Sequence, residues 1–314
     1  MSRTVFDAAV EGDRRLLARA ISLIEKGGAT LLQDISGLRP RRAGGPGRPH
    51  VVGITGPPGA GKSTFVNQLV VTARQGGKRV AVVAVDPSSP FTGGAILADR
   101  IRMEQHALDT NVFVRSVSSR GHLGGLCRAA GQVVDLMDAA GFDLVLVETV
   151  GVGQSELSVC EVADTVIVTL TPESGDTVQT MKAGLLEIAD LFVVNKADRP
   201  GADSLCKELE DAVELSATPG HGIEVVKASA LYGEGVDTVV EAVNRHLVWC
   251  TGPGREDWNQ RRRRGRVRTF LDLVADAARS DVLQQREGAA SSLFSRLETG
   301  EIGPYQAASL WVDR

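Results

Sequence analysis

The sequence predicts an α/β fold built on a mainly parallel, doubly wound sheet. Short apolar runs of strand character alternate with longer helical patterns from His50 to about Cys250, which is typical of repeated βα units. Several runs are followed at once by a polar or glycine-bearing segment, and parallel strands bring such ends to one edge of a sheet. The predicted strands are residues 51–55, 80–85, 112–115, 143–147, 166–170, 191–194 and 225–228.

Size and charge limit the kinds of protein that this chain can be. It has 314 residues and a mass of 33.2 kDa, and its 43% hydrophobic and 24% charged residues are ordinary values for a folded globular protein. The length suits one large domain with extensions, or two domains. The net charge of −4 at pH 7 provides no general positive field to attract nucleic acid or an anionic membrane. We therefore expect neither as a partner.

The N-terminal residues and the cysteines indicate the compartment. A secretory signal needs an early apolar stretch, whereas this N-terminus carries Asp7, Glu11 and Asp13. The longest apolar runs, such as 80–85, are far shorter than the roughly 20 residues that cross a bilayer. We expect a reducing, cytoplasmic location and no membrane span. The four cysteines, whose spacing matches neither a metal site nor a disulfide framework, are Cys127, Cys160, Cys206 and Cys250.

Composition divides the chain into three predicted parts. Residues 1–48 form a helical N-terminal extension and a linker rich in glycine and proline. Residues 49–250 form the α/β domain. Residues 251–314 form a helical C-terminal arm, which begins at the break made by Gly252, Pro253 and Gly254.

Two features of the flanking parts need interpretation. Residues 4–27 have a helical apolar pattern, with Asp13 as a candidate N-cap and Gly27 and Gly28 at the end. The arginine run within residues 261–268 could be a nucleic-acid patch, but it lacks interleaved aromatic residues. We interpret it instead as a solvated helix face or a surface of a dimer arm.

A glycine-rich segment directly after the first predicted strand has the pattern of a phosphate-binding loop. It reads Gly-Pro-Pro-Gly-Ala-Gly-Lys-Ser and opens a predicted helix, which is the context that this motif requires. Its backbone N–H groups and the helix N-terminus would surround phosphates, Lys62 would reach the β- and γ-phosphates, and the Ser63 hydroxyl would bind Mg²⁺. The candidate residues are Gly56, Pro57, Pro58, Gly59, Ala60, Gly61, Lys62, Ser63 and Thr64.

A second motif predicts the nucleobase. Asn195, Lys196 and Asp198 follow the strand 191–194, so they lie at the same sheet edge. A carboxylate accepts two hydrogen bonds from guanine, and adenine, which lacks that donor pair, would leave a buried Asp198 unsatisfied. Asn195 would brace the pocket. The companion loop, whose backbone N–H groups would face the guanine O6, is Ser229, Ala230 and Leu231.

Acidic residues at strand ends are candidates for the Mg²⁺ surroundings. Glu148 opens Glu-Thr-Val-Gly where a GTPase normally has Asp-x-x-Gly, and Gly151 would sense the γ-phosphate. Asp86 ends an earlier strand, and Asp99 follows on the next helix, where it could equally be a surface acid. Mg²⁺ needs several hard oxygen ligands, so Asp86, Asp99 and Glu148 join Ser63. Lys62, Ser63, Asp86, Glu148 and Gly151 form the predicted catalytic group.

These strings resemble the MeaB/ArgK family of G proteins, which are chaperones of methylmalonyl-CoA mutase. The matching stretches are residues 56–64, 86–103, 147–156 and 195–198. The resemblance implies a P-loop GTPase domain that binds GTP or GDP with Mg²⁺ at Ser63, Asp86, Asp99 and Glu148. It also implies a homodimer formed through the C-terminal arm. The segment 173–184 would be a partner-sensing switch, with Glu173, Gly175, Asp176, Gln179 and Lys182.

The expected function is a GTPase switch that serves a cobalamin-dependent acyl-CoA mutase. It would gate adenosylcobalamin loading and protect the mutase from inactivation. The mutase's adenosyltransferase is a second candidate partner. Val152 follows Gly151 where many small GTPases have the glutamine that orients water, so slow intrinsic hydrolysis is expected. One alternative is a nucleotide-dependent kinase. Another is a metal-insertion GTPase, for which His106, His122 and Cys127 are candidates, although their spacing fits no ligand pattern.

Overall fold

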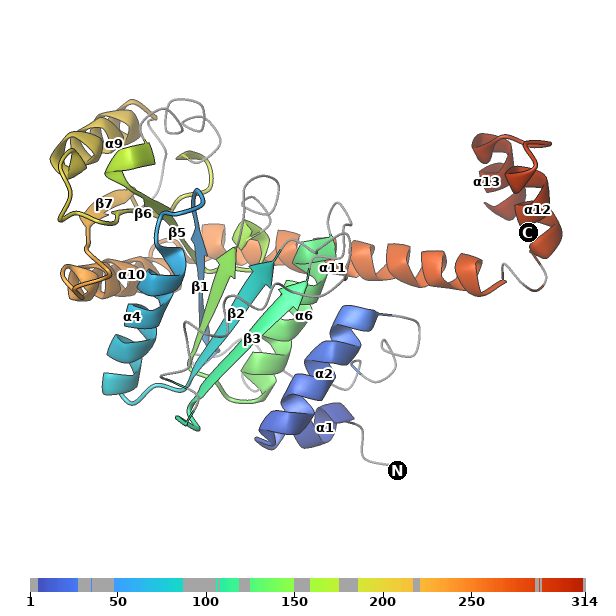
Figure 1. Ribbon diagram of the computed structural model, residues 1–314, viewed down its shortest axis with the longest axis horizontal. Coiled ribbons are helices and arrows are strands. Elements are labelled where there is room, and N and C mark those ends of the chain that lie inside the picture. Colours follow the sequence, from blue (N-terminus) through green and yellow to red (C-terminus); the bar gives the residue numbers. More distant parts are fainter. Residues whose placement is uncertain are drawn as a thin grey trace.

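A computed structural model of the chain describes residues 5–27, 48–86, 108–118, 125–149, 159–174, 186–216, 221–285 and 290–312, and positions 35, 106 and 288. It contains one sheet of seven parallel strands in the order β3-β2-β4-β1-β5-β6-β7 (Figure 1). The predicted α/β class and parallel sheet are confirmed. The strands are β1 His50–Thr55, β2 Val80–Asp86, β3 Val112–Ser118, β4 Leu144–Thr149, β5 Thr165–Leu170, β6 Leu191–Val194 and β7 Glu224–Lys227.

The central strands β1, β4 and β5 are buried along their whole length because helices cover both faces of the sheet. In β4, Leu144 and Leu146 pack with helices α4 (Lys62–Gln75) and α10 (Val236–Thr251). The alternate residues Val145 and Val147 face the opposite side. The helices that contribute to that side are α2 (Arg14–Lys26), α6 (Gly125–Ala139) and α9 (Ala202–Ser216).

The N-terminal extension differs in one respect from the single predicted helix. It forms two helices, α1 (Val5–Val10) and α2, because Gly12 takes a φ of +104° and turns the chain between them. Asp13 caps α2 as predicted, since its carboxylate accepts hydrogen bonds from the N–H groups of Arg15 at 2.8 Å and Leu16 at 3.1 Å. Both helices pack beside α6 (Figure 1).

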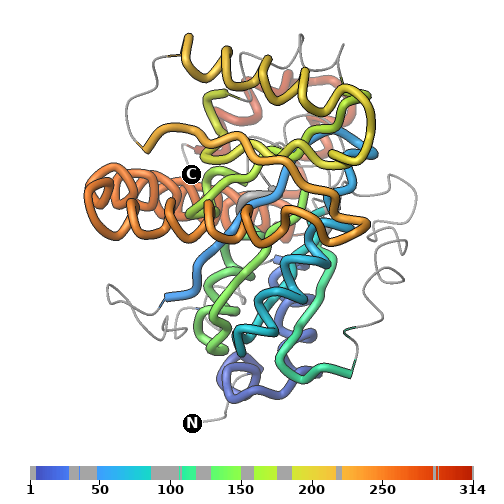
Figure 2. Tube along the Cα trace, turned by 90° about the vertical axis from the view of Figure 1, so that its left-hand side faces the viewer, coloured from blue at the N-terminus to red at the C-terminus, as the bar shows by residue number. Residues whose placement is uncertain are grey.

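The C-terminal part is a long helix followed by a small helical unit. Helix α11 (Arg255–Gln284) runs beside α10 (Figure 2) and continues beyond the sheet. Helices α12 (Ser291–Glu298) and α13 (Pro304–Val312) pack on each other at its far end. The small core of this unit consists of Leu293, Ile302 and Ala307. None of the described helices is both long and apolar enough to cross a membrane.

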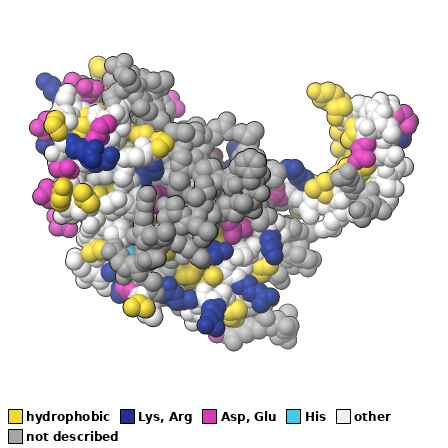
Figure 3. All heavy atoms as spheres, viewed as in Figure 1, with side chains coloured by type: hydrophobic (Ala, Val, Ile, Leu, Met, Phe, Trp, Pro, Cys, Tyr) yellow, Lys and Arg dark blue, Asp and Glu magenta, His cyan; other side chains and the backbone are white. Residues whose placement is uncertain are grey.

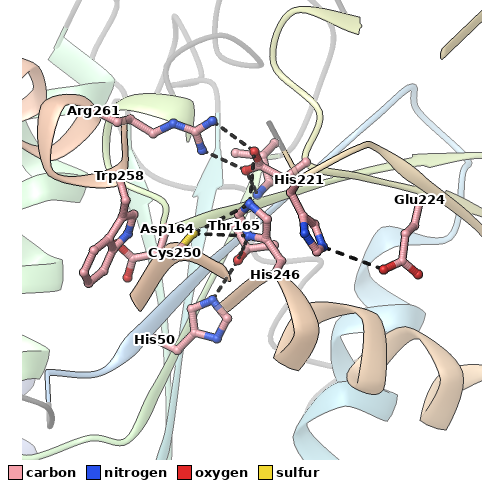
Figure 4. A network of polar contacts seen from close by, with 11 residues as sticks. His50, Asp164, Thr165, His221, Glu224, His246, Cys250, Trp258 and Arg261 are labelled. Carbon is pink, nitrogen blue, oxygen red and sulfur yellow. Dashed lines mark hydrogen bonds and ion pairs between the residues drawn. The ribbon is translucent and has the colours of Figure 1, made fainter. Parts of the chain in front are cut away.

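The arginine run is not simply a solvated helix face, which corrects the expectation for two of its members. Arg261 makes two hydrogen bonds to the Asp190 carboxylate, at 2.8 and 2.9 Å. The Arg262 guanidinium donates to Asp164 at 2.8 Å and lies 3.9 Å from the centre of the Trp258 ring. These residues join α11 to the amino-terminal ends of β5 and β6, whereas the phosphate-binding loop follows the carboxyl end of β1; Figure 4 shows Arg261, Trp258 and Asp164 in this contact.

Both aspartates also hold the sheet itself together. Asp164 directly precedes β5, and its carboxylate accepts a hydrogen bond from the backbone N–H of Val51 in β1 at 3.0 Å. Asp190 directly precedes β6 and accepts from the N–H of Val166 in β5 at 2.8 Å. Each carboxylate therefore links two neighbouring strands to α11.

Candidate functional site

The glycine-rich segment forms a tight loop between β1 and α4, where a Cβ atom at either of two glycines would collide with a neighbouring atom. Gly56 has a φ of +138°, and a Cβ atom there would lie 2.0 Å from the carbonyl oxygen of Thr169. Gly61 has a φ of +81°, and its Cβ would lie 2.5 Å from Nδ2 of Asn195. The loop is thus pressed against the strand ends of β5 and β6.

Lys62 is held at the loop by backbone carbonyl groups. Its Nζ donates to the carbonyl oxygens of Gly56 at 2.7 Å and Pro57 at 3.0 Å, and the residue is 7% exposed. The ammonium group therefore lies inside the loop. Lys62 is also the first residue of helix α4. A cation at the positive end of a helix, surrounded by a glycine-rich turn, is suited to binding phosphate oxygens.

Ser63 and Glu148 provide oxygen atoms side by side. The Ser63 hydroxyl donates to Oε1 of Glu148 at 2.6 Å, and Glu148 is 2% exposed near the end of β4. Asp86 ends β2, which pairs with β4 so that Ala84 lies opposite Glu148. The hydroxyl and these carboxylates are the hard ligands that Mg²⁺ prefers, so these residues fit this cation. The Asp86 side chain, Asp99 and Gly151 lie outside the described residues.

Asn195 connects the two halves of the predicted nucleotide site. Its Nδ2 donates to the carbonyl oxygen of Ala60 at 2.8 Å, and its Oδ1 accepts from the N–H of Ala230 at 3.0 Å. The residue is 2% exposed. One side chain thereby fixes the distance between the phosphate-binding loop and the loop at residues 229–231. The neighbouring Lys196 has a φ of +57°, which turns the chain towards Asp198.

Asp198 is exposed at the surface of the site, and its burial against a bound base stays a prediction. Its Oδ1 accepts a hydrogen bond from the buried hydroxyl of Ser229. The Ser229 N–H donates to the Glu234 carbonyl at 2.8 Å, and the Leu231 side chain is 73% exposed. The carboxylate is therefore presented at an open surface with one internal donor.

Glu173 lies beside the base motif, in the 3-10 helix η3 (Pro172–Ser174) that follows β5. Its carboxylate accepts a hydrogen bond from Nη1 of Arg199, which lowers the pKa of Glu173 to about 2. The other predicted switch residues, Gly175, Asp176, Gln179 and Lys182, lie outside the described residues. Arg199 was not among the site residues predicted from the sequence. Its position directly after Asp198 could have indicated that its side chain lies near the base motif.

The predicted residues that the structure describes meet at the carboxyl ends of the strands. The phosphate loop follows β1, Glu148 lies one residue before the end of β4, and the base motif follows β6, as Figure 1 shows for the elements. Of the metal-relay candidates, the structure describes the side chain of His106, which contacts Asn67 at 2.8 Å, while the His122 and Cys127 side chains lie outside the described residues. Fold and site together define a P-loop GTPase.

Comparisons with known proteins give the family. The family model described as "Methylmalonyl Co-A mutase-associated GTPase MeaB" matches residues 17–288, and the chain belongs to this family. A putative GTPase of Pyrococcus abyssi is 40% identical over 306 residues, covering 96% of this chain and 92% of that protein. The mouse protein named "Methylmalonic aciduria type A homolog, mitochondrial" is 36% identical over 265 residues, covering 79% and 64%.

A solved structure supports the fold assignment over nearly the whole chain. The crystal structure described as an LAO/AO transport system kinase superposes with a TM-score of 0.68 at 26% sequence identity. The match covers 99% of this chain and 97% of that chain. The architecture described above, including the segments that flank the sheet, is therefore shared with that protein.

Proposed function

We propose that the protein is a Mg²⁺-dependent GTPase that acts as a switch for a cobalamin-dependent acyl-CoA mutase, by gating adenosylcobalamin loading and protecting the mutase from inactivation. The single observation that carries the nucleotide part is the Asn195 side chain, which joins the phosphate loop to the 229–231 loop. The family description supports the mutase part, and methylmalonyl-CoA mutase is the partner that it indicates.

The phosphates and the base of GTP would bind at the two loops that Asn195 joins. The N–H groups of residues 56–63 and the Lys62 ammonium would contact the β- and γ-phosphates. To do so, Lys62 exchanges its present carbonyl acceptors for phosphate oxygens. Asp198 would accept two hydrogen bonds from guanine, and Lys196 would lie along the base. These contacts fix GTP for in-line attack by water without a covalent intermediate.

The metal would bind next to the γ-phosphate. Ser63, Asp86, Asp99 and Glu148 are the residues that would hold Mg²⁺, whose charge would stabilise the developing charge on the leaving phosphate oxygens. Ser63 would turn its hydroxyl away from Glu148 to do so. Val152 occupies the position where many small GTPases have a water-orienting glutamine, so hydrolysis is expected to be slow without a partner.

The switch would act through the segments that contact the γ-phosphate and their neighbours. Loss of that phosphate releases the residues around Asp86, Asp99 and Gly151, which changes the affinity for a partner. The partner-sensing residues would be Glu173, Gly175, Asp176, Gln179 and Lys182. We propose that the active form is a homodimer joined through the C-terminal arm, and that the mutase's adenosyltransferase is a further possible partner.

A pull-down from native cell extract tests this proposal. The full chain is loaded with GDP or with a non-hydrolysable GTP analogue, and captured proteins are identified by mass spectrometry. The expected result is a cobalamin-dependent mutase whose yield differs between the two nucleotides. A control with Asp198→Ala should lose that difference, since guanine binding is lost. Recovery of only unrelated proteins would contradict the mutase assignment.

A kinase is the second candidate, because the protein in the similar crystal structure is described as one. Base preference separates the two activities. A kinase that uses ATP would tolerate Asp198→Ala, whereas a GTPase should lose about tenfold or more in GTP affinity when a charged hydrogen-bond acceptor for the base is removed.

Metal analysis of the purified protein tests the metal-insertion alternative, for which stoichiometric nickel or zinc is required.

A further inference from the structure

We propose that Glu173 is a positioning residue for guanine recognition: it holds the Arg199 guanidinium away from the Asp198 carboxylate, so that this carboxylate stays available to the base. The inference deepens the proposed function and rests on the assigned role of Asp198.

The two loops that carry these residues lie side by side. Strands β5 and β6 are neighbours, and Leu170 pairs with Val194 at their ends. Arg199 directly follows Asp198, and its N–H donates to the Lys196 carbonyl at 2.9 Å, which closes the turn. From this turn, Nη1 of Arg199 reaches the Glu173 carboxylate of η3. The ion pair is thus a polar link between the base-reading turn and the end of β5.

Helix η3 provides a fixed position for Glu173. Ser174 is 8% exposed, its N–H donates to the Thr171 carbonyl at 2.8 Å, and its hydroxyl accepts from the Thr171 N–H at 3.3 Å. A Cβ added at Gly201 would meet Cβ of Pro172 at 3.5 Å, so the chain after the base motif passes close to η3. The backbone that carries Glu173 is therefore held at the end of β5.

Arg199 contacts the Glu173 carboxylate and interacts electrostatically with the carboxylate of its sequence neighbour Asp198. The hydrogen bond to Glu173 raises the pKa of Arg199, and the nearby Asp198 charge acts in the same direction. Both members of the pair are about half exposed, at 51% for Arg199 and 48% for Glu173, so the pair adds little to folding stability. Its effect is on orientation. Without the Glu173 charge, Asp198 is the remaining carboxylate of the two, and a guanidinium there would occupy the oxygens that guanine needs.

Nucleotide titrations of the full chain test this inference. GDP and IDP are compared, because IDP lacks the exocyclic amino group that pairs with a carboxylate. We expect Glu173→Gln to weaken GDP binding about tenfold, the effect of one lost charged hydrogen bond, and to reduce the preference for GDP over IDP. The double variant Glu173→Gln with Arg199→Gln should recover GDP binding, since the competing guanidinium is then absent.

Matched controls keep the outcome specific. Lys227 and Asp203 form another exposed ion pair, with atoms 2.7 Å apart on β7 and α9, so Lys227→Gln with Asp203→Asn should leave GDP binding unchanged. Unchanged GDP binding in Glu173→Gln, or a double variant as weak as Glu173→Gln, overturns the inference while the mutase proposal stands. If Asp198→Ala binds GDP normally, the base assignment and this inference both fail. The pull-down tests the mutase proposal separately.

Discussion

At the scale of single residues, the site is built from close contacts that allow little change. The Gly56 backbone approaches the Thr169 carbonyl so closely that there is no room for a side chain. Gly59, in the same loop, also has a positive φ, of +77°, but a Cβ there would meet no atom within 4 Å. Substitutions at Gly56 and Gly59 can therefore distinguish the cost of a steric clash from the cost of an unfavourable backbone conformation.

We expect Gly56→Ala to lower the free energy of unfolding by at least about 3 kcal/mol, because the backbone must move to relieve the contact with Thr169. Gly59→Ala should cost about 1 kcal/mol, the strain of a left-handed alanine. Urea unfolding of the nucleotide-free variants measures both values. Equal losses in the two variants would show that the close approach at Gly56 contributes nothing.

A second residue-scale feature is the buried pair of histidines on Thr165. The Thr165 hydroxyl lies 2.8 Å from His50 Nε2 and 2.8 Å from His246 Nδ1 (Figure 4). Burial lowers the pKa of His50 to about 4, although the Asp164 charge acts in the opposite direction. Burial also lowers the pKa of His246. Both rings are therefore neutral at pH 7.

This pair predicts a loss of stability in acid. Between pH 6.5 and about 4 the unfolded chain binds a proton at His50 and the folded chain does not, so unfolding is favoured as pH falls. The contribution of His50 amounts to about 3 kcal/mol across that range. His50→Gln should flatten the dependence by this amount in denaturant unfolding measured at several pH values. A profile parallel to that of the unaltered protein would contradict the assignment.

At the scale of elements, α11 is held by its first turns. The neighbouring arginines provide a matched comparison, since the Arg262 side chain is 18% exposed beside a 3% exposed Asp164, while Arg263 and its partner Glu256 are 64% and 79% exposed. Arg262→Ala leaves a buried carboxylate without its cation, and we expect a loss of about 3 kcal/mol in unfolding free energy. Arg263→Ala should change it by less than about 0.5 kcal/mol. Thermal and urea unfolding of the pair would show whether burial decides the difference.

The elements that could be predicted from sequence are those with local signals. All seven strands could be located from sequence because each contains a short apolar run, even the partly buried edge strand β7. The phosphate loop is predictable because its glycines and Lys62 lie close together in sequence. The roles of Arg261 and Arg262 could not be predicted, because their partners Asp190 and Asp164 lie 71 and 98 residues away. Likewise, the exposure of Asp198 depends on how the turn after β6 sits on Ser229, which no local pattern encodes.

At the scale of the whole molecule, α11 exposes apolar side chains that suit the proposed dimer. Val267, Phe270, Leu271 and Val274 recur on one face of the helix, and each is at least 50% exposed. Hydrophobic side chains also gather on the α12–α13 unit, on the side towards the rest of the molecule (Figure 3). A second copy of the chain would cover such surfaces.

We expect Phe270→Glu with Val274→Glu to convert the proposed dimer to a monomer, because charges on a buried interface helix are poorly solvated. Sedimentation at micromolar concentration measures the mass, and GTP hydrolysis in the same samples shows that the nucleotide site is intact. Arg279→Glu, at an exposed position away from the apolar face of the same helix, is the control for added negative charge and should stay dimeric. A monomeric unaltered protein would contradict the dimer proposal.

Because α11 crosses the sheet domain and extends beyond it, a small tilt of this helix would move its far end by a larger distance. Gly265 lies where α11 passes η2 (Val159–Glu161), and a Cβ there would come within 2.4 Å of the Glu161 carbonyl oxygen. From Gly265 to the end of α11 the helix is about 30 Å long, at 1.5 Å per residue. A tilt of about 10° at this fulcrum would displace the α12–α13 unit by about 5 Å, which is one turn of helix. The close packing that Gly265 permits between α11 and η2 thus determines the direction of α11 and the position of the α12–α13 unit.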